Sequence, residues 1–334
     1  MTTSLNIDRR LLGIASLLLA TFSWGGMFLV SKGVLSQVEP AWFTLIRYSI
    51  SALVLLPLLA LRGAEPWRKL RAHAAGLSIR GLAGFGVFSV LLLTGLSMSV
   101  PSHGSLVMAT VPMSTQLLRW LLDGIRPNRA TLGTSLLALA GVAVVSGVLL
   151  PGNAAVSTWH GDALALASTL GWVWYTRGAA RYAELDVLEY TGLTVLASLP
   201  LLALGALLLT GSGLAQMPSL DGIAAHWHAL LYVGAISSAV AVLAFNYGVR
   251  SLGAVTATAF LNFVPVSVLL INLVLGKLPS GAELAGTAMV VAALLLHTRA
   301  SRMTATAAVP AVDVYPNGAP IRAAGPATCT SPAS

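Results

Sequence analysis

The feature that most constrains this chain is a series of apolar runs, each about as long as a membrane is thick. A helix rises about 1.5 Å per residue, so about 20 apolar residues cross the ~30 Å hydrocarbon core of a bilayer. This criterion predicts ten membrane-spanning helices, at residues 11–32, 41–61, 80–98, 101–122, 130–150, 161–181, 187–210, 228–250, 253–276 and 280–298. We therefore expect an all-helical membrane protein that crosses the bilayer many times.

Composition leads to the same expectation. Only 9% of the 334 residues are charged, whereas a soluble domain is typically about 25% charged. The chain cannot cover its surface with polar groups, so its main partner should be the lipid bilayer. The net charge of +8 does not indicate nucleic acid, because the basic residues lie between the apolar runs. The single cysteine, Cys329, excludes a disulfide within the chain.

The positions of the basic residues predict the orientation. Lysine and arginine concentrate in cytoplasmic loops. If the N-terminus is cytoplasmic, only Lys32 and Lys277 of the 19 basic residues fall in outer segments, and Arg47 falls inside a run. An even number of spans then places the C-terminus in the cytoplasm as well. Residues 299–334 are rich in Ala, Pro, Thr and Ser, which predicts a disordered cytoplasmic tail.

The runs divide into two related halves. The sequence PLLAL occurs at 57–61 and at 200–204, and SWGG at 23–26 has a counterpart in GWVW at 171–174. Gly95, Pro112 and Gly133 recur 153 residues later as Gly248, Pro265 and Gly286. Because each half has five runs, an odd number, the second copy must enter the membrane from the opposite side. We therefore predict two inverted repeats, 1–150 and 151–298, as in many secondary transporters.

Several segments carry a family resemblance. They are SWGGMFLVSKG in the first run, LIRYSISALVLLPLLAL in the second, GDALALASTLGWVWYTRGAARY at the start of the second half, and NYGVRSLGAVTATAFLNFVPVSVLLINLVLGK near its end. The chain resembles the EamA-type members of the drug/metabolite transporter superfamily over about residues 11–298. One departure is that family members usually carry Gly-Glu at the ends of the fourth and ninth spans, where this chain has LDGIRP and LGKLPS.

The resemblance implies a transporter and not an enzyme. It implies a multi-pass protein of the bacterial inner membrane that moves small metabolites by alternating access, foremost by efflux of amino acids or related compounds. Import or exchange of anionic metabolites is one alternative, and a membrane enzyme acting on lipid is another. The resemblance calls for no cofactor. A homodimer is left open.

Two prolines inside predicted spans indicate a substrate path. Pro112 and Pro265 are repeat mates, and a proline removes a helical hydrogen bond and disturbs the carbonyl four residues earlier. Both helices could bend around a central cavity, or the bends could serve packing alone. The same helix faces carry polar side chains at helical spacing. The candidate substrate-binding residues here are Ser105, Pro112, Gln116, Thr258, Asn262 and Pro265, with Asn246 and Tyr247 from the neighbouring span.

Arg47 is the charged residue within an apolar run. A charge at the bilayer centre costs about 2.5–3.5 kcal/mol on insertion scales. Its side chain could reach the outer headgroups, or it could face the cavity and hold a carboxylate or phosphate by paired hydrogen bonds. Trp24 could stack on a substrate or pack in the core. Both residues are predicted substrate contacts.

Histidines provide two further hypotheses. His103, near the outer end of its span, could be a proton-linked switch or an ordinary interfacial histidine. Asp221, His226 and His228 share a loop, but histidines two residues apart do not lie on one helix face, so we predict no metal site. No acidic residue lies deep in a predicted span, and Asp162 lies near the end of one. The sequence therefore does not identify a coupling ion.

Overall fold

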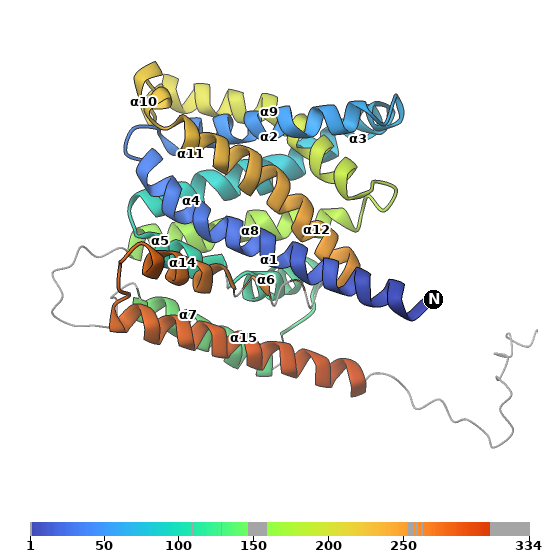
Figure 1. Ribbon diagram of the computed structural model, residues 1–334, viewed down its shortest axis with the longest axis vertical. Coiled ribbons are helices and arrows are strands. Elements are labelled where there is room, and N and C mark those ends of the chain that lie inside the picture. Colours follow the sequence, from blue (N-terminus) through green and yellow to red (C-terminus); the bar gives the residue numbers. More distant parts are fainter. Residues whose placement is uncertain are drawn as a thin grey trace, which may run out of the picture.

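The computed structural model describes residues 2–108, 110–127, 129–145, 159–252, 257, 260–261 and 263–307. Within these residues the regular structure is entirely helical, as the apolar runs predict. The long helices run alongside one another between two ends of a bundle (Figure 1). The start of the first helix and the end of the last one lie at the same end of this bundle, at the right in Figure 1.

The helices follow in order along the chain. The first half contains α1 (Thr2–Val34), α2 (Pro40–Ala60), α3 (Glu65–Gly81), the π-helical stretch η1 (Leu82–Val87), α4 (Phe88–Ser97), α5 (Pro101–Met108), α6 (Val111–Asp123) and α7 (Arg129–Val145). The second half contains α8 (Trp159–Ala179), α9 (Val187–Gly211), α10 (Leu220–Ala225), α11 (Trp227–Leu231), the π-helical stretch η2 (Tyr232–Val240), α12 (Ala241–Leu252), α14 (Phe263–Val274) and α15 (Gly281–Ala307).

Helix ends follow local sequence signals. Pro40 occupies the first turn of α2, where its missing N–H is not needed. Asp186 begins α9 with a capping box, in which its side chain accepts from the Glu189 N–H and Glu189 accepts from the Asp186 N–H. Gly124 ends α6 at a φ of 69°, a left-handed conformation that glycine adopts without strain. These signals place the turns at the two ends of the bundle.

Five helical segments are long and apolar enough to cross a membrane. Among the described residues these are Arg9–Val34, Pro40–Ala60, Glu65–Ser97, Val187–Gly211 and Trp227–Leu252. Each corresponds to one predicted span, with ends that agree within a few residues except at Glu65. Shorter apolar segments lie within three other predicted spans, at Leu132–Gly141, Phe263–Val274 and Gly281–Ala293. The chain is thus an all-helical, multi-pass membrane protein.

Three predicted boundaries differ from the structure. The third helical segment already begins at Glu65, because α3, η1 and α4 are continuous up to Ser97. The fourth predicted span is broken into α5 and α6, and Pro112 lies at the start of α6, where proline is tolerated. The last helix continues past the predicted end of its span to Ala307, so the first part of the predicted tail is helical. Residues 308–334 lie outside the described residues.

The two halves pack against each other through matching elements. Helix α4 packs on α8, and α12 packs on α1. The repeat mates α2 and α9 contact each other near one edge of the bundle, and α7 and α15 form a pair at the other (Figure 1). The π-helical stretches η1 and η2 fall in the third and eighth predicted spans, which are also mates. The two halves therefore meet along the middle of the molecule.

Candidate translocation site

The side chain of Arg47 points into the helix bundle. Only 3% of the residue is exposed, so it does not reach the outer headgroups. Its Nε donates to the Ser238 hydroxyl at 2.9 Å, one of its terminal nitrogens contacts the Met27 sulfur at 3.5 Å, and the guanidinium lies 4.9 Å from the centre of the Tyr48 ring. The other terminal nitrogen, Nη1, has no hydrogen-bond partner among the residues that the structure describes. The cation is therefore buried with one donor group unused.

No carboxylate among the described residues forms an ion pair with Arg47. A buried charge is costly unless it is paired and hydrogen-bonded. The neighbours that it does have, a hydroxyl, a thioether and an aromatic ring, are all neutral. The described residues therefore supply no anionic group to pair with Arg47, and an anionic group from elsewhere could bind there.

Aromatic rings from both halves surround this point. Trp24 meets its repeat mate Trp172 edge to face, with ring centres 5.9 Å apart and planes at 84°. Its indole N–H donates to the Ser237 carbonyl at 3.0 Å, which fixes the ring against η2. Phe245 packs 5.3 Å from Trp24, and Phe88 packs 5.4 Å from Trp172. Packed aromatic rings therefore form an apolar part of the wall near Arg47.

A small cavity lies between these groups. It is lined by Trp24, Met27, Phe28, Arg47, Tyr48, Phe88, Met108, Trp172, Ser237 and Val242. Its volume is about 20 Å³, which suffices for about one water molecule. A metabolite site typically needs about 300 Å³ or more. This cavity is therefore too small to hold a metabolite in this conformation.

The predicted site residues are brought together only in part. Trp24 and Arg47 line the central cavity. Ser105 is buried but donates to the carbonyl of Ser102 in its own helix. Asn246 donates to Thr191 at 2.9 Å, nearer the end of the bundle that carries the predicted inner loops. Tyr247 is 36% exposed on α12.

Two further predicted residues, Gln116 and Pro265, are not among the described residues that line the cavity. Gln116 is half-buried on α6, and Pro265 is buried near the start of α14. Pro112 begins α6, and the description of the structure covers its backbone only. Thr258 and Asn262 lie outside the described residues. Among the described residues, no group of three or more His, Cys, Asp or Glu side chains could hold a metal ion.

Several cavity residues were not predicted. Met27, Tyr48, Trp172 and Ser237 join Trp24 and Arg47 there. Trp172 had a signal, because the alignment of SWGG with GWVW makes it the mate of Trp24. The serine and methionine carry no pattern that separates them from ordinary packing residues of membrane helices.

Ion pairs join the halves at the end that carries the predicted inner loops. Arg62 contacts Asp186, and Lys69 contacts Glu189 at 2.9 Å. His73 contacts Glu184 at 3.0 Å. A fourth pair joins Arg177 to Asp123 through two hydrogen bonds, at 2.8 and 2.9 Å. In each pair one residue comes from each half, so these contacts link the two halves at this end of the bundle.

The opposite end contains a larger hollow. A vestibule of about 600 Å³ lies between the end of α1, the start of α5 and the turn from α14 to α15, and Lys32, Ser102, Asn272, Lys277 and Glu283 are among its lining residues. Lys32 is fixed, because its ammonium donates to the carbonyls of Leu96, Ser97 and Ser99 at 2.6–2.9 Å. This vestibule lies at the end of the bundle opposite the ion pairs.

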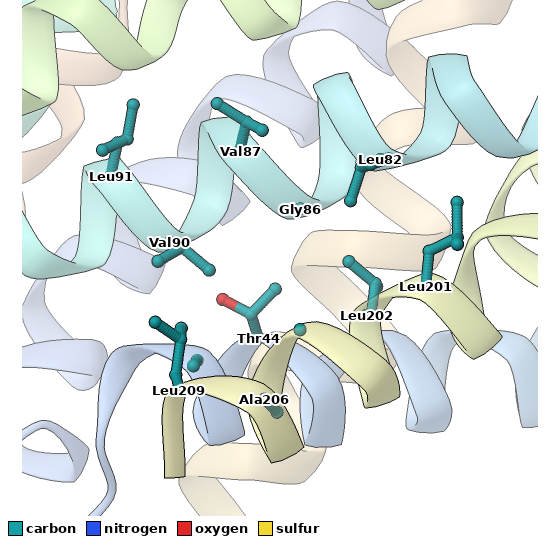
Figure 2. Close-up of a pocket in the computed structure, with 12 residues that line it drawn as sticks. Thr44, Leu82, Gly86, Val87, Val90, Leu91, Leu201, Leu202, Ala206 and Leu209 are labelled. Carbon is teal, nitrogen blue, oxygen red and sulfur yellow. The ribbon is translucent and has the colours of Figure 1, made fainter. Parts of the chain in front are cut away.

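A third hollow has a different character. A groove of about 260 Å³ runs between α2, the η1–α4 segment and α9 (Figure 2). Its lining is apolar except for Thr44, whose hydroxyl donates to the carbonyl of Pro40. This groove offers no free polar side chain to a charged or polar solute, whereas the cavity at Arg47 contains a buried, unused donor, so we take that cavity as the candidate site.

Comparison with known proteins identifies the family. The EamA-like transporter family matches residues 11–147 and again residues 159–299. The chain is 29% identical over 294 residues to the uncharacterized transporter YrdR of Bacillus subtilis, covering 86% of this chain and 91% of the relative. It is 28% identical over 294 residues to a probable terminal-alkyne amino-acid exporter of Streptantibioticus cattleyicolor, covering 85% and 92%.

A solved crystal structure has the same fold. It aligns with a TM-score of 0.62 at 22% sequence identity and covers 89% of this chain and 98% of its own. The relatives are named as transporters and not as enzymes, which leaves the lipid-modifying alternative without support. Both family matches together span nearly all the described helices. The chain therefore belongs to the EamA-like transporter family.

Proposed function

We propose that this transporter carries small metabolites with a carboxylate group, foremost amino acids, across the bacterial inner membrane. The observation that carries the proposal is the buried guanidinium of Arg47, which has an unused donor and no ion-pair partner among the described residues. Arginine binds carboxylates through two parallel hydrogen bonds. A carboxylate at this point would neutralise the charge and satisfy Nη1 at once.

The proposed topology has ten spans as two inverted repeats. The first repeat covers 1–150 and the second 151–298, and both termini face the cytoplasm. The twofold family match supports the division. The common end of the bundle for the start of α1 and the end of α15 supports an even number of crossings (Figure 1). The basic residues at the ion-paired end support its cytoplasmic placement.

Alternating access is the proposed mechanism. Ion pairs between the halves hold the cytoplasmic end closed, the central cavity is too small for a metabolite, and a vestibule leads in from the outer end. This combination describes an occluded carrier. Parting the ion pairs would admit a solute from the cytoplasm to Arg47, and parting the outer end would release it.

Efflux is the proposed direction. The relative named as a probable amino-acid exporter, aligned over most of both chains, supports efflux. Uptake or exchange of anionic metabolites is the second candidate, and the same arginine supports it, because a guanidinium binds any carboxylate or phosphate in either direction.

Purified protein in liposomes tests the substrate class. Vesicles loaded with labelled amino acids, nucleosides or cationic drugs should release at least one amino acid. In Arg47→Gln, transport of that amino acid should fall at least tenfold, because a charge-assisted pair is lost. Arg71→Gln removes an exposed arginine on α3 and serves as the matched control, with unchanged transport expected.

Two results would contradict the proposal. Equal transport of a carboxylate by Arg47→Gln and the parent would show that the arginine does not bind it. Transport of cationic drugs only, with or without Arg47, would exclude the carboxylate class. A separate measurement distinguishes efflux from uptake. The protein is reconstituted in the opposite orientation, an ion gradient is imposed, and the direction of net transport is compared.

A further inference from the structure

A buried histidine and aspartate meet at the outer end of the interface between the halves. His103 on α5 is 8% exposed, and Asp162 on α8 is 5% exposed. The His103 Nδ1 lies 3.2 Å from an Asp162 carboxylate oxygen. Ser99 joins them, because its hydroxyl donates to the other carboxylate oxygen at 2.6 Å and lies 3.2 Å from the same imidazole nitrogen. The contact thus links the first family match to the second.

Other charged groups face this pair from the neighbouring helices. Glu283 at the start of α15 lines the vestibule together with Ser102 of α5. Lys32 of α1 is bound to the carbonyl of Ser99. His160 of α8 and Lys277 after α14 lie at the same end and are exposed.

We propose that His103 and Asp162 form a proton-binding site whose occupancy holds the outer end of the transporter closed. The ligand is a proton from the outer solution. It binds the imidazole nitrogen and returns to the same solution, so no proton crosses the membrane in this step.

The physical reason lies in the strength of the contact. Histidine is the side chain whose charge ordinarily changes between pH 5 and 8. An imidazolium donates a charge-assisted hydrogen bond to the carboxylate, which is about twice as strong as a neutral one. This gain exists only while α5 and α8 touch. Proton binding and closure therefore favour each other, as linkage between two equilibria requires.

Cysteine labelling from outside measures opening without knowledge of the substrate. Replacing Cys329 by Ser gives a chain without thiols. Ser237→Cys then places a thiol in the central cavity, and Ser36→Cys places one at the exposed outer end of α1. The ratio of their labelling rates by a membrane-impermeant maleimide in intact spheroplasts cancels the pH dependence of thiol reactivity.

The expected result is a pH-dependent ratio. With His103 present, the ratio should rise about tenfold between external pH 5.5 and 8, the difference between a charged and a neutral hydrogen bond. In His103→Asn the ratio should be high and independent of pH, because asparagine retains a donor but cannot gain a charge. His160→Asn removes an exposed histidine of α8 and should keep the parent's dependence.

The proposal has clear contrary outcomes. A ratio that does not change with pH in the parent, or the same change in His103→Asn, would overturn it. Absence of labelling at Ser237→Cys at every pH would also overturn it, because the outer end would not open. His103→Gln and Asp162→Asn provide second variants if one protein does not fold, and both should abolish the pH dependence.

Discussion

At the scale of single residues, close contact between the halves requires glycine at positions where any side chain would not fit. Gly95 of α4 and Gly161 of α8 face each other, and a Cβ added to Gly95 would lie 2.4 Å from the Gly161 carbonyl oxygen. Gly248, the repeat mate of Gly95, lies against the side chain of Leu17 on α1, and a Cβ added to it would lie 2.4 Å from that side chain. Small residues allow membrane helices to approach closely. The repeated glycine therefore positions the helices that carry Trp24 and Trp172.

Gly95→Ala should destabilise the protein. The new methyl group meets backbone atoms of α8, which cannot rotate away as a side chain can. Overpacking of this kind costs about 1–3 kcal/mol. The melting temperature of the detergent-solubilised protein, followed by tryptophan fluorescence, should fall. Gly133→Ala is the matched control, because a Cβ on that helical glycine meets nothing within 4 Å. Equal melting of Gly95→Ala and the parent would contradict the close approach.

At the scale of elements, ion pairs join helices at the end away from the vestibule. The Arg177 guanidinium on α8 donates two hydrogen bonds to Asp123 at the end of α6. This bonding holds the pKa of the Asp123 carboxyl below its ordinary value. A carboxyl with a lowered pKa stabilises the folded state above its ordinary pKa, and this contribution is lost as the pH falls. The α6–α8 contact should therefore weaken in acid.

At pH 5–7, Asp123→Asn should lower the melting temperature. Below the pKa of the Asp123 carboxyl in the folded parent, the substitution should have no effect. The parent loses the same interaction by protonation, so the two melting temperatures should converge as the pH falls below 3.8, the ordinary value for Asp. Asp221→Asn, on the exposed start of α10, controls for the loss of a carboxylate. A constant difference between Asp123→Asn and the parent at all pH values would contradict a role of this ion pair.

At the scale of the whole molecule, the two ends of the bundle are chemically different. The ion-paired end carries most of the basic side chains, and the vestibule end carries Lys32 and Lys277. A carrier of this kind needs one interface that can part at either end around a fixed centre. The central cavity at Arg47 lies between the ion pairs at one end of the bundle and the cluster of His103 and Asp162 at the other.

The proposed topology predicts the behaviour of the only thiol. Cys329 should react with a membrane-permeant maleimide in intact spheroplasts and stay unlabelled by an impermeant one, because ten crossings keep the C-terminus in the cytoplasm. Labelling after lysis shows that the thiol is reactive. Rapid labelling by the impermeant reagent in sealed spheroplasts would require an odd number of crossings.

The sequence by itself determined the class of the molecule. Apolar length and the distribution of arginine and lysine are local properties, so they predict membrane helices and their direction without knowledge of contacts. The repeat also follows from the sequence, because short motifs such as SWGG and its counterpart GWVW recur in the same order in both halves. The early start at Glu65 was missed because polar residues precede the apolar run in one continuous helix.

Only the tertiary structure decided what the polar residues do. Arg47 could have reached the headgroups, but α1 and η2 cover it with Met27 and Ser238, which are far away along the chain. Ser105 looked like a path residue, yet its own helix satisfies its hydroxyl. Asp162 looked like a residue at a span end, yet packing buries it against His103. The physical reason is that the partner of a polar group in a membrane depends on which helices meet, and a single helix carries no record of its neighbours.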